Sequence, residues 1–417
     1  MNQEIKTRIE QIKRGEVPQG YKKTKVGIVP SEWKESHLKS KFNRLKRKNA
    51  EGNTNVLTIS AQHGLINQND FFNKEIASED KTNYYLLHNG DFAYNKSYSN
   101  GYPYGAIKKL TRYNKGVVSP LYICFSPTEE NKCPDYYEHY FEAGYLNKEI
   151  KAFAQEGARN HGLLNIAVDD FFNSYIVSPS FPEQQKISDI LTTQDKVIEV
   201  KEKLIAEKQQ QKKWLMQNLL TGKKRLKGFS GEWKKVEISK HLKPSSKTAV
   251  SDTTKYKKIT IKLNLKGIEY SNINREMADT RPFYVRKAGE LIIGKQNYFN
   301  GSIAILPVAF DGCICSNAIM SFYVKGANTN FIYEILSQRD FIEKRKYLAN
   351  GTGQKELSEK EFLQFRIELP PLPEQTAIAE ILSTADREIE LLQKDLAEEK
   401  QKKKALMQLL LTGIVRV

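Results

Sequence analysis

Two polar segments of the chain carry the side-chain types that contact nucleic acids. The segments KSYSNGYPYG (96–105) and KQNYFNG (295–301) each follow an apolar run and combine lysine, tyrosine, asparagine and glycine. Asparagine and glutamine hydrogen-bond base edges, tyrosine rings stack on bases, and lysine ammonium groups contact phosphates. The same composition also fits polar hairpins whose tyrosines lie on a sheet, so composition alone leaves both interpretations open.

The segments ISAQHGL (59–65) and EGARNHG (156–162) have a similar composition. A residue that reads a base should affect one position of a DNA sequence, whereas a phosphate-binding lysine should affect all sequences alike. We predict DNA contacts from polar and aromatic residues of these four segments: Ser60, Gln62, His63, Lys96, Tyr98, Asn100, Tyr102, Arg159, Asn160, Lys295, Gln296, Asn297, Tyr298 and Asn300.

Two patterns that could support catalysis are incomplete. Residues 289–296 nearly fit the phosphate-binding GxxxxGK[ST] motif, but Gln296 stands where a metal-ligating hydroxyl is needed. Residues 134–151 imitate the PD…ExK pattern of magnesium-dependent nucleases, but Glu149 and Lys151 lie two apart in a predicted helix and do not face each other. The sequence has no HExxH motif, no glycine-rich cofactor fingerprint and no Asn/Asp-Pro-Pro-Tyr/Phe motif of amino-methyltransferases. We therefore predict no catalytic residue, and no metal or cofactor bound by this chain.

The charge of the chain indicates a polyanionic partner. Its 417 residues include 66 Lys+Arg and 49 Asp+Glu, which gives a net charge of +17. Nucleic acid is the first candidate partner and anionic membrane the second, while a basic surface without a partner is the alternative. A hydrophobic content of 39% is enough for real cores and excludes wholesale disorder.

The apolar stretches and the cysteines indicate a cytoplasmic protein. The longest apolar stretch, 301–324, is interrupted by Pro307, Asp311 and Asn317, so it cannot span a bilayer. The first 15 residues lack the apolar core of a signal peptide. No CxxC pair occurs, so we expect reduced, mostly buried thiols rather than a zinc site at the four cysteines, which are Cys124, Cys133, Cys313 and Cys315.

A long internal repeat defines the architecture. Residues 182–222 and 373–413 align without a gap at an offset of 191, and 23 of the 41 positions are identical. Each copy starts with PEQ, ends with LLTG and has no internal Pro or Gly before the final residue, which predicts a helix that glycine terminates. About 38 residues at 1.5 Å each give a rod of roughly 57 Å. Such a length is typical of a coiled coil rather than of a globular helix.

An apolar stripe at spacings of three and four runs along each predicted helix, and two such seams most simply pack on each other antiparallel. The stripe turns polar in both copies, near Lys208 and Lys212 and near Glu399 and Lys403. This polar stretch is either solvated where the helices diverge, or a platform for a partner or a phosphate backbone. Ten apolar residues of the two stripes are our partner-binding candidates: Ile187, Leu191, Ile198, Leu215, Leu219, Ile378, Leu382, Ile389, Leu406 and Leu410.

The globular parts repeat more faintly. GDFAYNK (90–96) parallels GELIIGK (289–295), and the start VPSEWK (29–34) parallels FSGEWK (229–234). Short runs rich in Val, Ile, Tyr and Phe between Gly, Asn, Asp and Ser predict strands, with helices near 135–155 and 330–348. We predict a mixed α+β (α/β) fold with two pseudo-symmetric globular domains joined by two long antiparallel coiled-coil helices.

The ordered set of duplicated motifs resembles the specificity subunit of type I restriction-modification systems. The resemblance is carried by SPSFPEQQKISDIL (178–191), LPPLPEQTAIAEIL (369–382), the endings LMQNLLTG and LMQLLLTG, and the domain starts PSEWK and SGEWKK. It covers essentially the whole chain. The second domain departs from the first, because it has GCICSNA where the first has GVVSPLY (116–122). DNA contacts that are inferred from the family therefore transfer less directly to the second domain.

The resemblance implies a division of the chain into five parts. Residues 26–181 and 223–372 would be target recognition domains, each reading one half of an asymmetric, bipartite double-stranded DNA sequence. Residues 182–222 and 373–417 would be conserved helical spacers, and residues 1–25 would be an N-terminal helix and lead-in that complete the second spacer.

The resemblance also implies partners. Two methyltransferase (modification) subunits would dock on the helices, and two restriction/translocase subunits would complete the enzyme. S-adenosylmethionine, ATP and Mg²⁺ would bind those partners, so this chain would be non-catalytic. Two half-sites about one helical turn apart, roughly 34–36 Å, would lie on one face of the duplex.

Two alternatives belong to other classes. A coiled-coil scaffold without a DNA role predicts no salt-dependent DNA binding by the assembled complex. A single-chain nuclease or methyltransferase predicts activity of the isolated chain and needs an active site that the motifs do not supply.

Overall fold

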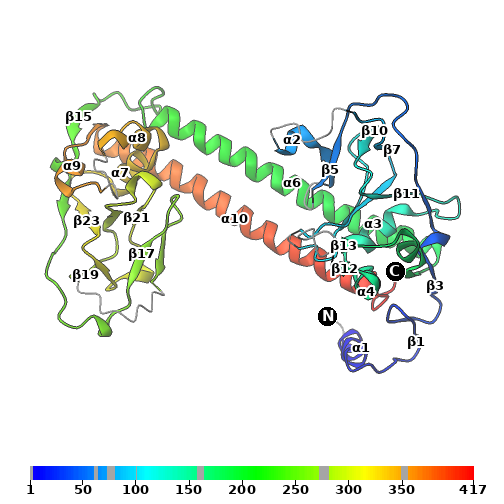
Figure 1. The fold of residues 1–417 in the computed structure, drawn as a ribbon. Coiled ribbons are helices and arrows are strands. Elements are labelled where there is room, and N and C mark those ends of the chain that lie inside the picture. Colours follow the sequence, from blue (N-terminus) through cyan, green and yellow to red (C-terminus); the bar gives the residue numbers. More distant parts are fainter. Residues whose placement is uncertain are drawn as a thin grey trace. The chain divides into compact units, whose positions relative to one another are not determined.

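The computed structural model describes residues 3–60, 64–72, 80–99, 101–156, 164–271, 281–348 and 356–417. The chain forms two compact units: the first is Met1–Glu202 with Asp395–Val417, and the second is Lys203–Lys394. Each unit contains one β-rich domain and a part of each long helix (Figure 1).

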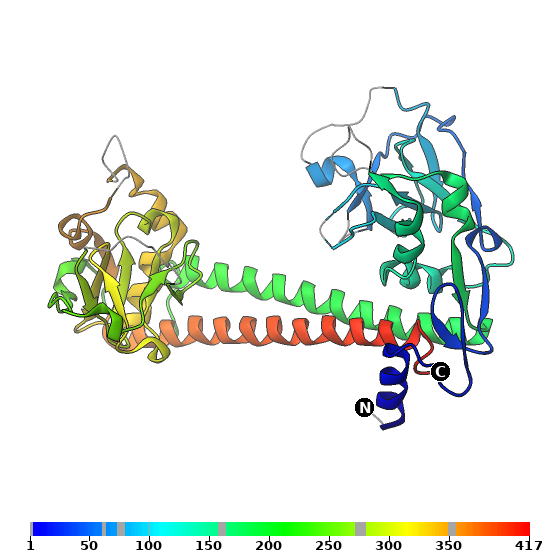
Figure 2. The same ribbon diagram turned by 60° about the horizontal axis from the view of Figure 1, so that its bottom comes forward.

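The two long helices are the predicted ones. Helix α6 spans Phe181–Leu219 and helix α10 spans Leu372–Leu410, 39 residues each. They run side by side in both views (Figures 1 and 2). Beyond their ends, Gly222 and Gly413 both have φ of +69°, the left-handed conformation that terminates helices and favours glycine. The mixed fold and the paired antiparallel helices are therefore confirmed.

The polar stretch of the helix pair is filled by ion pairs that cross between the helices. In the first unit, Asp195 pairs with Lys403 at 2.5 Å, and Glu202 pairs with Lys400 at 2.6 Å. In the second unit the cross-helix pairs are Lys208–Glu388 and Lys212–Asp386, both at 2.6 Å. Ion pairs therefore bridge the two helices in this polar stretch, an arrangement that neither of our two alternatives described.

The domain of the first unit is built around a four-stranded sheet of order β4-β11-β8-β9, with helices packed on it. The elements of this unit before the long helix are α1 (Gln3–Lys13), β1 (Tyr21–Lys23), β2 (Ile28–Pro30), β3 (Lys34–His37), η1 (Leu38–Ser40), β4 (Phe42–Arg44), β5 (Leu57–Ser60), β6 (Gly64–Asn67), α2 (Gln68–Phe72), β7 (Tyr85–His88), β8 (Phe92–Asn95), β9 (Ala106–Lys109), β10 (Lys115–Val118), β11 (Ile123–Pro127), α3 (Pro134–Glu142), α4 (Asn147–Phe153), β12 (Gln155–Glu156), β13 (Leu164–Asn165), α5 (Val168–Asn173) and β14 (Tyr175–Ser178).

The domain of the second unit repeats this plan around the sheet β16-β23-β20-β21. Its elements are β15 (Lys234–Glu237), η2 (Ile238–Lys240), β16 (Leu242–Pro244), η3 (Thr253–Lys255), β17 (Ile259–Ile261), β18 (Ile268–Tyr270), β19 (Phe283–Val285), β20 (Leu291–Gly294), η4 (Tyr298–Asn300), β21 (Ile303–Ile305), η5 (Val308–Phe310), β22 (Ile314–Ser316), β23 (Ile319–Val324), α7 (Thr329–Ser337), α8 (Arg339–Glu343), η6 (Lys346–Leu348), α9 (Glu359–Leu363) and β24 (Arg366–Leu369).

Two helix predictions were wrong in the same way. The segment 135–155 forms α3 and α4, because Gly144 adopts a left-handed φ of +75° between them. The segment 330–348 forms α7, α8 and a short 3-10 helix, because Gln338 has an extended ψ of 131°. An apolar, helix-favouring composition did not reveal these single-residue breaks.

Each unit has its own apolar core. In the first, the rings of Phe42, Phe92 and Phe125 pack together and contact Phe141 of α3 and Phe171 of α5. In the second, Leu291, Phe322 and Phe362 hold the corresponding place. All four cysteines are buried and unpaired. None of the described helices is long and apolar enough to cross a membrane.

Candidate nucleic-acid interface

The predicted DNA-contacting segments begin at matching places in the two domains. Lys96 follows the central strand β8, and Lys295 follows the central strand β20. The backbone N–H of Leu164 donates to the Lys96 carbonyl (3.1 Å), and that of Leu357 donates to the Lys295 carbonyl (3.0 Å). The repeat in the sequence therefore corresponds to the same backbone pairing in both sheets.

In the first domain, the predicted residue Tyr98 is exposed, whereas the predicted residue Tyr102 is held in place by hydrogen bonds. The Tyr98 ring is 63% exposed and available for stacking. The Tyr102 hydroxyl donates to the Glu142 carboxylate (2.5 Å), and Lys108 donates to that hydroxyl (3.2 Å) while pairing with Glu142. Burial, with Glu142 beside it, raises the pKa of Tyr102, so the phenol stays protonated. Tyr102 thus anchors the segment to α3.

Lys96 is half-buried. Partial burial lowers the pKa of its ammonium group. Lys295 is half-buried and lies 3.8 Å from the Glu356 carboxylate. If either lysine contacts a DNA phosphate, the phosphate replaces water or, at Lys295, the weak contact with a carboxylate. The new hydrogen bond between ammonium and phosphate would be stronger than the contact that it replaces.

In the second domain, Gln296, Asn297 and Asn300 are exposed. Tyr298 is not: its side chain is 0% exposed, and its hydroxyl donates to the Leu336 carbonyl of α7 (2.8 Å). A fully buried ring cannot stack on a base, so we leave Tyr298 out of the proposed surface. The alternation of polar and aromatic letters in KQNYFNG did not reveal which residue faces the core.

The remaining candidates are only partly described. Ser60, at the end of β5, is 5% exposed and is therefore a poor base reader in this conformation. Gln62, His63, Asn100, Arg159 and Asn160 lie outside the described residues.

A hairpin of the second domain was missed by our sequence analysis. Strands β17 and β18 form a hairpin in the same relation to the sheet as β5 and β6, whose tip we had included. The backbone N–H groups of Asn264 and Leu265 donate to the carbonyls of Asn300 (2.8 Å) and Gly301 (3.0 Å). The tip therefore lies directly against the predicted DNA-contacting segment. The available signal was the strand ITIK followed by the turn residues N and KG.

The apolar stripes of the long helices hold each unit together. Ile187 and Leu191 are fully buried in the first core, and Ile378 and Leu382 are at most 1% exposed in the second. Leu219, Ile389 and Leu410 are also buried, whereas Ile198, Leu215 and Leu406 are half-buried. The large apolar residues that the helices leave exposed are others, namely Phe181 (45%), Val200 (63%), Trp214 (47%), Leu372 (47%) and Leu391 (61%).

Each PEQ motif, at the start of one long helix, is bonded to a residue that follows the end of the other long helix. We call these two contacts the joints. The buried Glu183 carboxylate accepts two hydrogen bonds from Arg416, at 2.5 and 2.9 Å, and Glu374 accepts two from Arg225, at 2.6 and 2.7 Å. These bonds raise the pKa of both arginines. Each arginine follows the glycine of an LLTG ending by three residues, so the motif pair explains why PEQ and LLTG repeat together.

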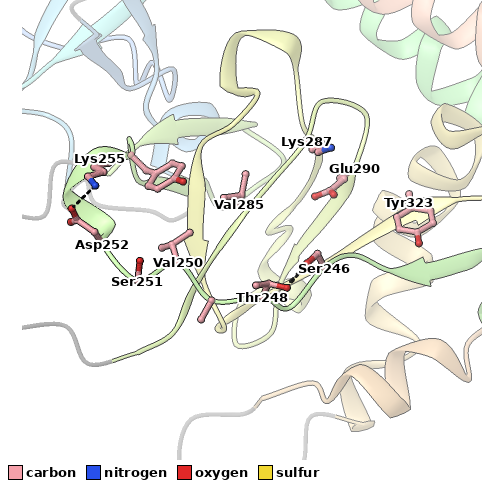
Figure 3. Close-up of a pocket in the computed structure, with 12 residues that line it drawn as sticks. Ser246, Thr248, Val250, Ser251, Asp252, Lys255, Val285, Lys287, Glu290 and Tyr323 are labelled. Atoms are coloured by element: carbon pink, nitrogen blue, oxygen red, sulfur yellow. Dashed lines mark hydrogen bonds and ion pairs between the residues drawn. The ribbon is translucent and has the colours of Figure 1, made fainter.

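A pocket of about 790 Å³ opens in the second domain (Figure 3). Its lining includes Glu290, the residue before β20, and does not include Lys295. Glu290 lies at it with an exposure of 9% and accepts a hydrogen bond from the Ser321 hydroxyl (2.8 Å). The lining contains no histidine or cysteine. The residues around it are Ser246, Thr248, Ala249, Val250, Ser251, Asp252, Lys255, Tyr256, Val285, Lys287, Glu290 and Tyr323.

The chain has two β-rich domains, and each is packed on a part of the two long helices. Each domain presents a polar segment at the same place. These features define a class of two-domain protein with one polar binding surface in each domain. Residues 235–400 match the family model of the type I restriction modification DNA specificity domain. The chain therefore belongs to the family of type I restriction-modification specificity subunits. It is the DNA specificity subunit of such a system and is itself non-catalytic.

Two curated relatives are specificity subunits by name, and the first of them aligns over almost the whole chain. The putative type I restriction enzyme MjaX specificity subunit of Methanocaldococcus jannaschii is 26% identical, over 96% of this chain and 97% of that protein. The type I restriction enzyme MjaVIII specificity subunit of the same organism is 24% identical, over 66% of this chain and 69% of that protein.

Solved structures share the fold. The crystal structure of a type I restriction-modification system S subunit from M. genitalium superposes with a TM-score of 0.56 at 14% identity, covering 91% of this chain and 96% of that one. A chain from a structure on complex assembly and conformational transition of the type I R-M system gives 0.52 at 16% identity, covering 93% and 99%.

Proposed function

We propose that the chain reads an asymmetric, bipartite double-stranded DNA sequence, with one half-site for each β-rich domain. Residues 26–181 and 223–372 are the proposed target recognition domains; 182–222 and 373–417 are the proposed spacers, completed by 1–25. The carrying observation is that Lys96 and Lys295 begin polar segments at the same place in both sheets, while the side chains that follow differ. Matched frames with different exposed side chains suit two different half-sites.

We further propose that the helix pair docks two methyltransferase subunits, and that two restriction/translocase subunits join them. S-adenosylmethionine, ATP and Mg²⁺ would then act on those partners. One structural relative is described in terms of the complex assembly of a type I R-M system, which supports an assembly of this kind. The exposed Val200, Trp214 and Leu391, away from the helix starts at Phe181 and Leu372, are apolar anchors that the described helices offer to a partner.

Long-read methylation mapping of the host genome, with and without the gene, tests the main proposal. We expect deletion to remove one bipartite, asymmetric methyladenine motif. Binding of the reconstituted complex to DNA should also fall steeply with salt, because counterions are released from phosphates. If the methylome is unchanged although the reconstituted complex methylates DNA in vitro, the proposal is wrong.

Single-domain variants then assign the half-sites. Tyr98→Ala should relax one position of the first half-site only, and Asn297→Ala one position of the second only, each by about 1–3 kcal/mol. Lys295→Ala should weaken all sequences alike and reduce the salt slope by about 1. If Asn297→Ala leaves both motif and affinity unchanged, the assignment of that residue fails while the general proposal stands.

A further inference from the structure

The tip of the β17–β18 hairpin has an unusual backbone. Asn264 and Leu265 have φ of +58° and +59°, and they are the two non-glycine residues reported with positive φ among the described residues. Asparagine tolerates this left-handed region, but leucine is disfavoured there because its Cβ crowds the following carbonyl oxygen. Glycine at position 265 would form the same turn more easily.

The strained turn is held by its neighbour. The two backbone hydrogen bonds to Asn300 and Gly301 fix both tip residues against the segment 295–301. A Cβ on Gly301 would stand 3.1 Å from the Leu265 nitrogen and 3.2 Å from the Asn264 Cα, so the contact depends on the glycine. The tip and the predicted DNA-contacting segment therefore form one surface.

The leucine side chains of the tip are not used by the core. Leu263 and Leu265 are each 43% exposed and belong to neither core cluster of the second domain. Lys266 is exposed beside them. A disfavoured backbone at a residue whose side chain does not stabilise the fold points to a use of that side chain outside the fold.

The chemistry of the tip fits the edge of a base pair. In the major groove a thymine presents its C5-methyl group, which apolar side chains read by contact. A neighbouring lysine then meets the phosphates that line the groove. Between β5 and β6 of the first domain the sequence is Ala61-Gln62-His63, without a leucine, so such a contact would belong to the second half-site alone.

We propose that the β17–β18 tip is a specificity-determining element, in which Leu265, with Leu263 beside it, contacts the C5-methyl of a thymine in the second half-site, and Lys266 contacts an adjacent phosphate. This inference rests on the proposed function, since it names one contact of the second reading module.

The test uses the reconstituted complex with its methyltransferase partner, on duplexes of the mapped target. Each thymine of the second half-site is replaced in turn by uracil, which removes only the methyl group. The wild-type complex should lose about fourfold in affinity at one position, the effect of returning one methyl-sized group to water. The Leu265→Gly complex should bind the thymine and uracil duplexes equally at that position.

Leu265→Gly also keeps the test independent of folding, because glycine suits the turn. Its melting temperature should equal or exceed that of the wild type. Val308→Ala, at an 82% exposed valine of the same domain, is the matched control and should keep the wild-type loss on uracil. Lys266→Ala should reduce the salt slope without changing the thymine preference.

Three outcomes would overturn the inference: a second half-site without thymine, no loss with uracil at any position, or the same loss in the wild-type and Leu265→Gly complexes. They differ from failure of the proposed function, in which the wild-type complex would show no bipartite preference.

Discussion

The two domains rest on the helix pair through one conserved and one changed contact. The ion pair Asp195–Lys403 of the first unit and Asp386–Lys212 of the second are related by the offset of 191. His139 lies over the first ion pair and Glu334 lies over the second. His139 is the sixth residue of α3, and Glu334 is the sixth residue of α7. The two helices carry the same bridging charges at equivalent positions, whereas the two domains differ in the titratable group that lies over those charges.

A second comparison concerns the acid that opens each central strand. Asp91 lies 3.6 Å from Arg47 and accepts the His88 backbone N–H (2.7 Å), whereas Glu290 accepts from Ser321. The motifs GDFAYNK and GELIIGK begin with the aligned glycines Gly90 and Gly289. Three residues before these glycines, the first domain has the buried Leu87 and the second has the buried Arg286.

Of these polar groups, Glu290 lines the pocket of Figure 3, and Arg286 is hydrogen-bonded to a second lining residue, Ser246. The Arg286 guanidinium donates to the Cys315 sulfur (3.2 Å) and to the Ser246 carbonyl (3.1 Å). Divergence between the domains is thus concentrated away from the helices.

The joints offer the largest test of this pseudo-symmetry. Arg416→Ala leaves the Glu183 carboxylate, whose side chain is 5% exposed, without a cation. We expect a loss of about 2–3 kcal/mol, at the low end for buried pairs because the arginine itself is 39% exposed. Thermal unfolding and limited proteolysis at the end of α10 measure it.

Arg225→Ala is the matched variant. It should destabilise less, because residues 220–233 connect α6 to its domain covalently, whereas the end of α10 meets the first domain only through contacts such as Tyr21 hydroxyl to Gly413 carbonyl (2.7 Å). An equal or larger effect of Arg225→Ala would contradict this account of the two joints.

The groups above the ion pairs should make the two units respond oppositely to acid. Burial lowers the pKa of His139 to about 4, so the folded state holds this imidazole neutral. Its contribution is intact above pH 6.5 and is lost as the pH falls toward 4, by about 2 kcal/mol at pH 5. His139→Gln should remove that loss, which hydrogen exchange of α3 peptides, corrected for intrinsic rates, would report.

Glu334 should have the reverse effect. Burial raises the pKa of this carboxyl, with Lys212 opposing and Asp386 adding to the shift. The folded state therefore favours the protonated form, and the associated stability is present below pH 4.5 and lost as the pH rises through the raised pKa. Protection of α7 should improve on acidification while that of α3 declines. Parallel acid responses in both helices would contradict the comparison.

Two buried tyrosines test whether a tyrosine of these segments stabilises the fold or contacts DNA. Tyr94 donates to the Tyr104 carbonyl (2.5 Å) and stacks on Phe171, while Tyr298 donates to the Leu336 carbonyl (2.8 Å) and packs edge-on against Phe362. Tyr298→Phe should cost about 1 kcal/mol of stability and leave every position of the DNA motif unchanged. A changed motif in methylation mapping would show that Tyr298 does contact DNA.

The sequence was sufficient where a long pattern repeats. The gap-free repeat, the prolines at its start and the glycines beyond its end predicted α6 and α10 to within about three residues, because helix periodicity and caps are local signals. The matched positions of Lys96 and Lys295 followed from the aligned GDFAYNK and GELIIGK strands.

The sequence was insufficient where one residue or one side-chain direction decides. Gly144 and Gln338 each break a helix that composition favours. Tyr298 and Tyr98 lie in similar polar strings, yet one is buried and the other exposed, because the Phe171 position is covered by Tyr94 in the first domain and its equivalent Phe362 by Tyr298 in the second. The Arg416–Glu183 joint connects residues 233 apart, which no local pattern indicates.

The smallest expected effect concerns the ion pairs themselves. Lys403→Met and Lys212→Met each remove a cation whose side chain is about 20% exposed from an aspartate that is 41% or 51% exposed. At neutral pH we expect equal losses of about 0.5 kcal/mol, since such pairs are largely screened. Urea unfolding in low and high salt measures both, and a several-fold difference would contradict their equivalence.

Below pH 6 the same two variants should diverge, because the neighbouring groups differ. Lys403 lowers the pKa of His139, so its removal relieves a repulsion and makes the α3 contact less sensitive to acid. Lys212 lowers the pKa of Glu334, so its removal favours the protonated carboxyl further and strengthens the dependence of the α7 contact on pH. One substitution at two equivalent positions would thus have opposite effects on pH dependence, which is the expected signature of an unchanged helix pair beneath two diverged domains.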